Sequence, residues 1–454
     1  MRKIKCGASE VVITPRLGIG IPGYYEERLA NDKIDDLYVK TVVFDDGEIL
    51  TGVAVADMSH IYMNLVHKAR ERVRALTGRD ASGIIIAATH THTGGNSDTG
   101  EYEASAASES DVEDIVNKIA DSIVYAIKRE KEFKIGFAKT EEHEVSFNRR
   151  WWMKDGVVHT WPGINNPDNI RPASGIDPEI DVIRIDDLSG NPIAVLTNFA
   201  NHPDTSGGGC AFCADYPGEL DRRLKKTLGQ NVVSVFMNGC CGDITHVDYS
   251  GKFPLVPNQQ NIIGAKLAAD VLSVYGDIKC EEVHELGVKT KTITIERRQF
   301  TKEQYEEAKK KIEEGEKLLN SSREKIDQSD DEFEKPTTGD MLIMELTYCY
   351  DAVKLYEHPI LSEQAEMQVI KIGDIMINSM PGEMFNELGL DLKARSASDK
   401  NIIVTLANGY YGYIATEKAY SEGGYEVTLD HFNNLVPGAG ETIVNVILDL
   451  QKEL

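Results

Sequence analysis

Residues 82–95 read SGIIIAATHTHTGG, a stretch that joins a strand signal to two closely spaced histidines. Its run of isoleucines and alanines is typical of a short buried β-strand. The polar residues that follow end in two glycines, so we expect the chain to leave the sheet there as a loop. Because side chains at positions i and i+2 of an extended segment point the same way, His90 and His92 can face one cavity.

The rest of the chain repeats this alternation of apolar strands and amphipathic helices. Asp46-Gly47 joins two β-rich runs and predicts a hairpin. Further strand signals cover 181–187, 193–202, 232–239, 374–383 and 401–413. Helix signals cover 62–78, 112–130, 217–229, 383–396 and 441–454. This order predicts an α/β fold with a mixed β-sheet core flanked by helices.

One charged segment, residues 301–335, differs from its surroundings. It opens with Thr301-x-x-Gln304, a capping-box pattern, and then continues as a long charged helix. We expect a solvated helical insertion, with a lid or a dimer arm as the alternative. Because no internal repeat or low-complexity tract divides the chain, the sequence predicts one catalytic domain over residues 1–454.

The amino-acid composition disfavours several kinds of partner. The 454 residues carry a net charge of −25, which disfavours nucleic acid and anionic membrane surfaces as partners. No apolar run is long enough to span a bilayer, and no apolar region follows the basic N-terminal residues. We therefore expect a cytoplasmic enzyme with a small-molecule substrate. The sequence permits a homo-oligomer but does not fix the oligomeric state.

More polar side chains follow other predicted strands. His202 stands at the end of the strand signal at 193–202, and Glu383 at the end of the one at 374–383. Tyr410, Tyr411 and Tyr413 follow the apolar part of the signal at 401–413. Catalytic groups of α/β proteins gather beyond the carboxyl ends of strands. Imidazole and carboxylate groups are ligands of catalytic zinc. The alternatives are histidines that only make hydrogen bonds in loops and an acid at a helix N-terminus.

Short islands along nearly the whole chain resemble the neutral ceramidase family (neutral/alkaline non-lysosomal ceramidases). The islands are GASEVVITP (7–15), ATHTHTGG (88–95), IDPEIDVIRIDDLSGNPIAVLTNFANHP (176–203), NGCCGDITH (238–246), MPGEMF (380–385) and NGYYGYIATEKAYSEGGYE (408–426). The resemblance implies a zinc-dependent hydrolase of linear amides, such as N-acyl compounds of lipid metabolism. Metal-activated water would attack the carbonyl carbon.

The resemblance also implies a role for each matching residue. One Zn²⁺ ion would be held by His90, His202, Glu383 and Tyr413, with water in the open position. The catalytic residues around the substrate would be His92, Tyr425, Arg149 and Thr245. Iron or manganese would also suit this donor set.

Several features depart from the family pattern. Thr245 stands where the family has serine, and the final helix at Leu454 leads us to expect no C-terminal immunoglobulin-like domain. Trp151 and Trp152 beside Arg149 suggest a polar, aromatic-walled site. The alternatives are therefore an ester or lactone hydrolase, an enzyme of sugar-like substrates on the same site, or a non-catalytic metal- or ligand-binding homologue.

Two further sets of residues have open interpretations. Asp57 and Asp215 either orient a ligand histidine or cap local structure. The CxxC pair Cys210 and Cys213 and the adjacent Cys240 and Cys241 are either small buried thiols or a second metal or redox site. Seven cysteines without a repeating spacing favour reduced thiols over a disulfide framework.

Overall fold

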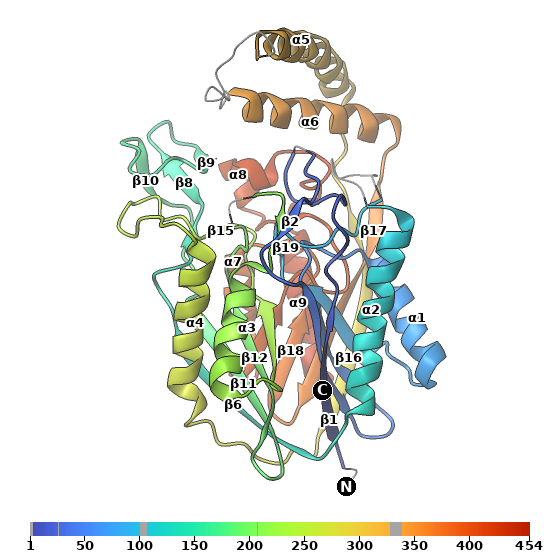
Figure 1. The fold of residues 1–454 in the computed structure, drawn as a ribbon. Helices are drawn as coiled ribbons and strands as arrows, with labels where there is room; N and C mark the ends of the chain where they lie inside the picture. Colours follow the sequence, from blue (N-terminus) through green and yellow to red (C-terminus); the bar gives the residue numbers. More distant parts are fainter. Residues whose placement is uncertain (1–2, 26, 100–106, 207, 327–337) are drawn as a thin grey trace.

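Three four-stranded sheets form the centre of the computed structural model, which describes residues 3–25, 27–99, 107–206, 208–326 and 338–454 (Figure 1). The first sheet has the order β1 (Lys5–Val12), β3 (Tyr38–Asp45), β4 (Leu50–Ala56) and β5 (Ile84–Ala88). The second has the order β14 (Val233–Asn238), β12 (Pro192–Phe199), β11 (Glu179–Asp187) and β6 (Phe133–Glu141). The third has the order β16 (Leu286–Glu296), β17 (Ser362–Ile372), β18 (Ile375–Ser379) and β20 (Asn401–Val404).

Each of these sheets contains one parallel pair among antiparallel pairs. The parallel pairs are β4 with β5, β12 with β14, and β18 with β20. The hairpin predicted at Asp46-Gly47 is confirmed, and Gly47 adopts a φ of 95° that favours glycine. Because parallel strands end at the same edge of a sheet, the loops that follow them can meet around one site.

Helices cover the outer faces of the sheets and bury their apolar sides. The first sheet packs against α1 (Met63–Thr77) and α2 (Glu109–Lys128), and the second against α3 (Asp215–Leu228) and α4 (Gln259–Tyr275). The third packs against α7 (Asn386–Arg395) and α9 (Ala439–Lys452). A buried core contributed by strands of all three sheets includes Phe44, Ile183 and Ile377. The predicted α/β class, with mixed sheets flanked by helices, is confirmed.

The charged segment predicted at 301–335 begins as α5 (Lys302–Ile326). A second helix, α6 (Thr338–Glu357), lies beyond the predicted end, and α5 and α6 together form the insertion. The predicted capping box is present, because the Thr301 and Gln304 N–H groups each donate to the other's side-chain oxygen (2.9 and 3.3 Å). Residues 327–335 of the predicted segment lie outside the described residues. The two helices share a small apolar cluster that includes Ala308 and Cys349.

Figure 1 shows α6 lying across the end of the molecule where several short elements are drawn. Those labelled are β2 (Asp32–Lys33), β8 (Arg150–Met153), β9 (Val158–Thr160), β10 (Asn169–Pro172), β15 (Ile244–Thr245), β19 (Glu383–Met384) and α8 (Ala419–Glu422). The chain also has the short strands β7 (Phe147–Asn148), β13 (Ala211–Phe212) and β21 (Tyr413–Ile414), and a 3-10 turn at Tyr425–Val427. The helix predicted from 383 begins later, at Asn386, because Glu383 and Met384 pair with β21 instead.

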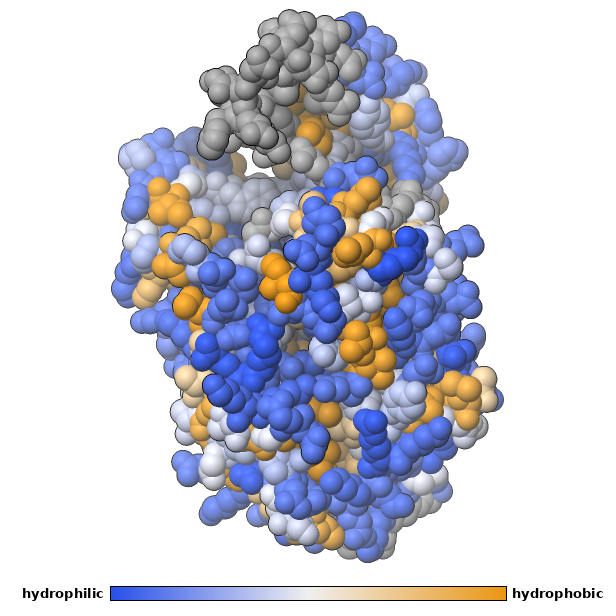
Figure 2. All heavy atoms as spheres, in the orientation of Figure 1, coloured by the Kyte–Doolittle hydropathy of each residue, from blue (hydrophilic) through white to orange (hydrophobic). Residues whose placement is uncertain are grey.

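The face of the molecule in Figure 2 is mainly hydrophilic, with hydrophobic residues in small separate groups. Among the residues that the structure describes, no helix has the length and apolarity needed to cross a bilayer.

Candidate functional site

Three histidines from two distant segments meet beyond the ends of β5 and β12. One side-chain nitrogen of each of His90, His92 and His202 lies within 4.8 Å of those of the other two. The Nε2 atoms of His92 and His202 are 3.0 Å apart. His90 has a φ of 74°, an uncommon left-handed conformation that turns its side chain where the strand ends. The loops therefore place three imidazoles around one point.

Each of these imidazoles is oriented by a backbone carbonyl group that lies far from it in sequence. The pairs of Nδ1 and carbonyl oxygen are His90 with Ser59 (2.6 Å), His92 with Gly23 (3.0 Å) and His202 with Cys241 (3.4 Å). A carbonyl oxygen only accepts, so each Nδ1 carries a proton and each Nε2 is turned toward the cluster. Such anchoring of the distal nitrogen is typical of metal-ligating histidines.

Glu383 and Tyr413 complete the cluster from two short paired strands. The parallel register of β19 and β21 sets Glu383 opposite Tyr413, so both side chains are carried to the same region. Glu383 Oε2 lies 3.2 Å from His90 Nε2, and Glu383 Oε1 accepts a hydrogen bond from the Tyr410 hydroxyl (2.8 Å). The structure thus brings His90, His202 and Glu383 together and sets Tyr413 beside Glu383.

The donor set of this cluster fits a bound cation. His90 Nε2 and Glu383 Oε2 are both buried, and neither has a hydrogen-bond partner within the described part of the chain. Burial and His90 lower the pKa of His202 well below its ordinary value, so His202 is neutral and able to bind a cation. The pKa of Glu383 is lowered because His90, His202 and Arg149 outweigh the effect of burial. A buried imidazole nitrogen and a buried carboxylate oxygen that face one another in this way are the kinds of atom that a metal ion binds.

Tyr410 holds the carboxylate, and its removal gives a direct test of this geometry. We expect Tyr410→Phe to weaken metal binding about 10- to 100-fold, because partners that orient a ligand have effects of this size. Titration against a chelating dye measures the change in Kd. Tyr411→Phe is the matched control, since the adjacent Tyr411 hydroxyl binds the Gln364 carbonyl instead. Equal Kd values for both variants would contradict a ligand role for Glu383.

Arg149 is a buried cation beside the cluster. Its guanidinium lies 5.1 Å from the ring centre of Tyr413. Its Nε donates to Glu426 Oε1 (2.7 Å), and its Nη2 donates to the Gly242 carbonyl (2.7 Å). Burial opposes the charge of Arg149, but Tyr413 and Glu426 raise its pKa well above the ordinary value. Arg149 is therefore a fixed positive charge at the edge of the site.

Thr245 is the last residue of the short strand β15, and the residue after it contacts the loop of His202. β15 pairs with β7, and Thr245 Oγ1 accepts a hydrogen bond from the Val247 N–H (3.3 Å). The next residue, His246, forms an ion pair with Asp204, with Nδ1 and Oδ1 2.9 Å apart. Asp204 lies two residues beyond His202, so this pair stands at the rim of the histidine cluster.

The aromatic wall is built from other residues than the sequence suggested. Trp151 donates its indole N–H to the Asn148 carbonyl (3.1 Å), and Trp152 lies beside Arg171. Trp161 instead lies near Arg149, with 5.7 Å from the guanidinium to its ring centre. The ring of Trp161 is 4.8 Å from that of Tyr425. The predicted aromatic neighbours of Arg149 are thus replaced by Trp161, which a turn after β9 brings back to the site.

Further residues at the site were not identified from the sequence. His60 stacks on Tyr410 with 4.2 Å between ring centres, and Tyr25 donates a hydrogen bond to the Tyr425 hydroxyl (2.9 Å). A signal for His60 was present, because it follows the apolar strand β4 just as His90 follows β5. Tyr25 lies in a loop without periodicity, so no sequence pattern marks it.

The residues with open interpretations have structural roles. Asp57 accepts a hydrogen bond from the Tyr38 N–H (2.8 Å), and Asp215 accepts one from the Ser206 N–H (2.8 Å). Neither carboxylate orients one of the three clustered histidines, because backbone carbonyls do so. All seven cysteines are free, and burial raises the pKa of Cys213, Cys240 and Cys241. Cys213, Cys240 and Cys241 are therefore buried thiols rather than ready thiolates, whereas Cys210 is half-buried.

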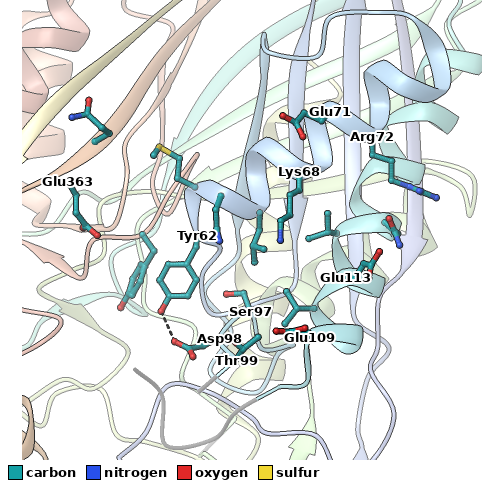
Figure 3. Close-up of a pocket in the computed structure, with 18 of the residues that line it drawn as sticks. Tyr62, Lys68, Glu71, Arg72, Ser97, Asp98, Thr99, Glu109, Glu113 and Glu363 are labelled. Atoms are coloured by element: carbon teal, nitrogen blue, oxygen red, sulfur yellow. Dashed lines mark hydrogen bonds between the residues drawn. The ribbon is translucent and has the colours of Figure 1, made fainter. Parts of the chain in front are cut away.

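A separate groove adjoins the cluster on the far side of Tyr410. It has a volume of about 1170 Å³ and lies between α1 and α2 (Figure 3). Its lining mixes both charges, including Lys68, Arg72 and Glu113, and the Tyr62 hydroxyl donates to Asp98 there (3.2 Å). The three clustered histidines do not line it. This groove is therefore distinct from the candidate metal centre.

Comparison with solved structures identifies the fold of the chain. No protein-family model and no curated protein matches the sequence. Among solved structures, the neutral ceramidase from Pseudomonas aeruginosa matches with a TM-score of 0.72 and 16% identity, over 99% of this chain and 74% of the other. The structure described as "Ceramidase complexed with C2" matches with a TM-score of 0.73 and 16% identity, over 99% and 75%. The chain has the neutral ceramidase fold.

The neutral ceramidase fold agrees with the resemblance seen in the sequence. The islands at 88–95, 380–385 and 408–426 all fall on the loops that carry the clustered side chains. Local sequence similarity and the overall arrangement of the chain therefore point to the same region of the molecule.

Proposed function

We propose that the protein is a metal-dependent hydrolase of linear amides, with zinc as the ion. The observation that carries the proposal is the convergence of three inward-facing Nε2 atoms and the Glu383 carboxylate. The neutral ceramidase fold supports amide hydrolysis as the reaction. We assign His90, His202, Glu383 and Tyr413 as the ligands. A bound zinc ion would lower the pKa of water from about 15.7 toward about 7 and supply hydroxide at neutral pH.

His92 has a different role from the other two histidines in this proposal. His90 and His202 are fully buried, whereas His92 is half-buried and faces the open side of the cluster. Its Nδ1 proton is committed to the Gly23 carbonyl, so Nε2 is the atom that exchanges protons. Burial and His90 lower the pKa of His92 to about 4, which leaves Nε2 unprotonated at neutral pH. His92 Nε2 therefore accepts a proton during attack and returns it to the leaving amine.

Three further side chains surround the carbonyl group in this proposal. Burial raises the pKa of Tyr425 well above its ordinary value, so its hydroxyl remains a donor for the developing oxyanion. Arg149 adds a fixed positive charge that also holds Tyr413 in position. Thr245 supplies a hydroxyl at the family's serine position, within the loop that carries His246.

Metal analysis and metal removal test the proposal. The purified protein is expected to contain about one zinc ion per chain and to hydrolyse members of a panel of N-acyl amines. Dialysis against a chelator should abolish hydrolysis, and one equivalent of zinc should restore it. Metal at about 1000 times its Kd adds about 4 kcal/mol to the stability, which corresponds to about 4 °C in Tm for a chain of this length. Differential scanning calorimetry measures that shift.

Two results would contradict the proposal in different ways. A protein without stoichiometric metal would exclude the metal centre. A zinc-loaded protein that cleaves esters or lactones, but no amide, would keep the centre and reject the reaction. The matched ester and amide of one acyl group separate these outcomes.

A further inference from the structure

Three tyrosine hydroxyl groups from distant segments meet beside the candidate metal centre. Tyr25 donates to the Tyr425 hydroxyl (2.9 Å), and the Tyr348 hydroxyl lies 3.4 Å from that of Tyr25. The rings of Tyr25 and Tyr348 are in edge contact, with 6.0 Å between their centres. Tyr25 belongs to the N-terminal region and Tyr348 to α6, so the charged insertion contributes directly to this cluster.

The ring of Tyr425 lies between the hydroxyl cluster and Tyr413, a proposed metal ligand. The ring centre of Tyr425 is 5.4 Å from that of Tyr413 and 4.8 Å from that of Trp161. Trp161 is 47% exposed, so part of its ring remains open to a ligand. Phenol hydroxyls and one partly exposed aromatic face therefore lie next to the proposed ligand Tyr413.

α6 is attached to the loop that follows Tyr425. Asp351 of α6 accepts a hydrogen bond from the backbone N–H of His431 (3.2 Å). At the base of the insertion, Arg297 donates to Asn434 and to Glu363 (3.0 Å for the Nε contact). These contacts hold Tyr348 beside Tyr25, so α6 forms part of the surroundings of the hydroxyl cluster.

The chemistry of the cluster suits hydroxyl groups rather than alkyl chains. The ordinary pKa of a phenol, about 10, keeps all three hydroxyls protonated at neutral pH. Because Tyr25 donates to Tyr425, the Tyr425 proton remains available for another acceptor. An alkyl chain against this cluster would leave the Tyr425 proton without an acceptor, whereas a polyhydroxylated ligand can accept from it and donate to the phenol oxygens. Sites built to bind hydroxyls reject analogues that lack them by large factors.

We propose that the site takes a small amide whose polar part carries several hydroxyl groups, such as an N-acylated amino sugar, and that Tyr348 determines this specificity. The juxtaposition of the Tyr25, Tyr348 and Tyr425 hydroxyls beside Tyr413 carries the proposal. It rests on the proposed amide hydrolysis, which it deepens by naming the substrate class. Long-chain N-acyl sphingoid compounds are excluded by it as preferred substrates.

Two ring amides of equal size test the specificity in the zinc-loaded full chain. An N-acetylhexosamine carries hydroxyls, and N-acetylcyclohexylamine does not. We expect kcat/KM to be at least about 100-fold higher for the hexosamine amide. Tyr348→Phe should lower kcat/KM for the hexosamine amide about 5- to 10-fold, mainly through KM, and leave the cyclohexyl amide unchanged.

Tyr350→Phe is the matched control on the same helix. Tyr350 lies two residues from Tyr348, is 47% exposed and donates to Glu316 of α5 (2.6 Å). Removal of the Tyr350 hydroxyl should leave kcat/KM unchanged for both amides. A Tyr348→Phe variant that affects both amides equally, or neither, would overturn the proposal. So would a preference for a long-chain N-acyl sphingoid amide.

Binding separates failure of this inference from failure of the proposed function. If no amide is hydrolysed, calorimetric titration with the N-acetylhexosamine still measures recognition. Binding that Tyr348→Phe weakens about 5- to 10-fold would support the hydroxyl-lined site without the reaction. Absence of binding to the wild-type chain would overturn the inference.

Discussion

Replacement of His90 by alanine is expected to abolish both metal retention and amide hydrolysis. His90 contributes a buried Nε2 that faces Glu383 Oε2 at 3.2 Å. Without the ion, water loses the pKa shift on which the proposed attack depends. We expect kcat/KM to fall by at least about 10³-fold. Bound metal should fall from about one equivalent to a small fraction, as measured by mass spectrometry.

The left-handed backbone at His90 determines the choice of variants. The φ of 74° is adopted more readily by asparagine than by most residues, so His90→Asn serves as the second variant. It keeps the backbone conformation but does not extend a nitrogen to the position of Nε2. His143→Ala is the control, because His143 is exposed and pairs only with Glu141. Full activity in His90→Asn would contradict the proposed metal centre.

Glu426→Ala is expected to lower the free energy of unfolding by about 3–5 kcal/mol. The Glu426 carboxylate is buried and lies 2.7 Å from Arg149 Nε and 3.5 Å from Arg150 Nε. It also accepts a hydrogen bond from Thr160 (2.8 Å). Its removal leaves two buried guanidinium groups without this partner, which costs more than the pair contributes in an intact protein. Urea unfolding followed by tryptophan fluorescence measures the change.

An exposed ion pair provides the control for that measurement. Asp391 and Arg395 on α7 are about half exposed, and Asp391→Ala should change the stability by less than about 1 kcal/mol. Combination of Glu426→Ala with Arg149→Met should recover part of the loss, because the second change removes one of the stranded charges. A loss for Glu426→Ala as small as that for Asp391→Ala would show that Arg149 does not depend on Glu426.

Local patterns predicted much of the fold and the principal loops of the site. The apolar run before His90 and the Asp46-Gly47 turn are local signals, and both elements occur where expected. Glu383 was expected to begin a helix, but it forms a strand with residues near Tyr413. That pairing joins segments that are far apart in the chain, so no local period encodes it.

Sequence patterns did not predict the groups that orient the histidines or the aromatic residue that lies beside Arg149. Carbonyl groups such as that of Ser59 hold the imidazoles, and every residue has a carbonyl group. Trp151, Trp152 and Trp161 differ little in sequence context. Only the β8–β9 hairpin and the φ of 54° at Trp161 select the one that faces Arg149. Likewise, the charge pattern predicted helix over residues 301–335, whereas Tyr348 lies beyond that segment on α6 and no pattern indicated its place at the site.

The insertion point of the α5–α6 pair has a consequence for evolution. The pair leaves the chain at the end of β16 and returns at the start of β17, where Glu296 and Ser362 are already partners across the sheet. Its small apolar cluster belongs to the two helices themselves. Exchange or loss of this unit would leave the ladder between the strands intact. Related chains can therefore diverge in what they accept while they inherit the same reactive centre, and grafting this unit between homologues offers a route to altered selectivity.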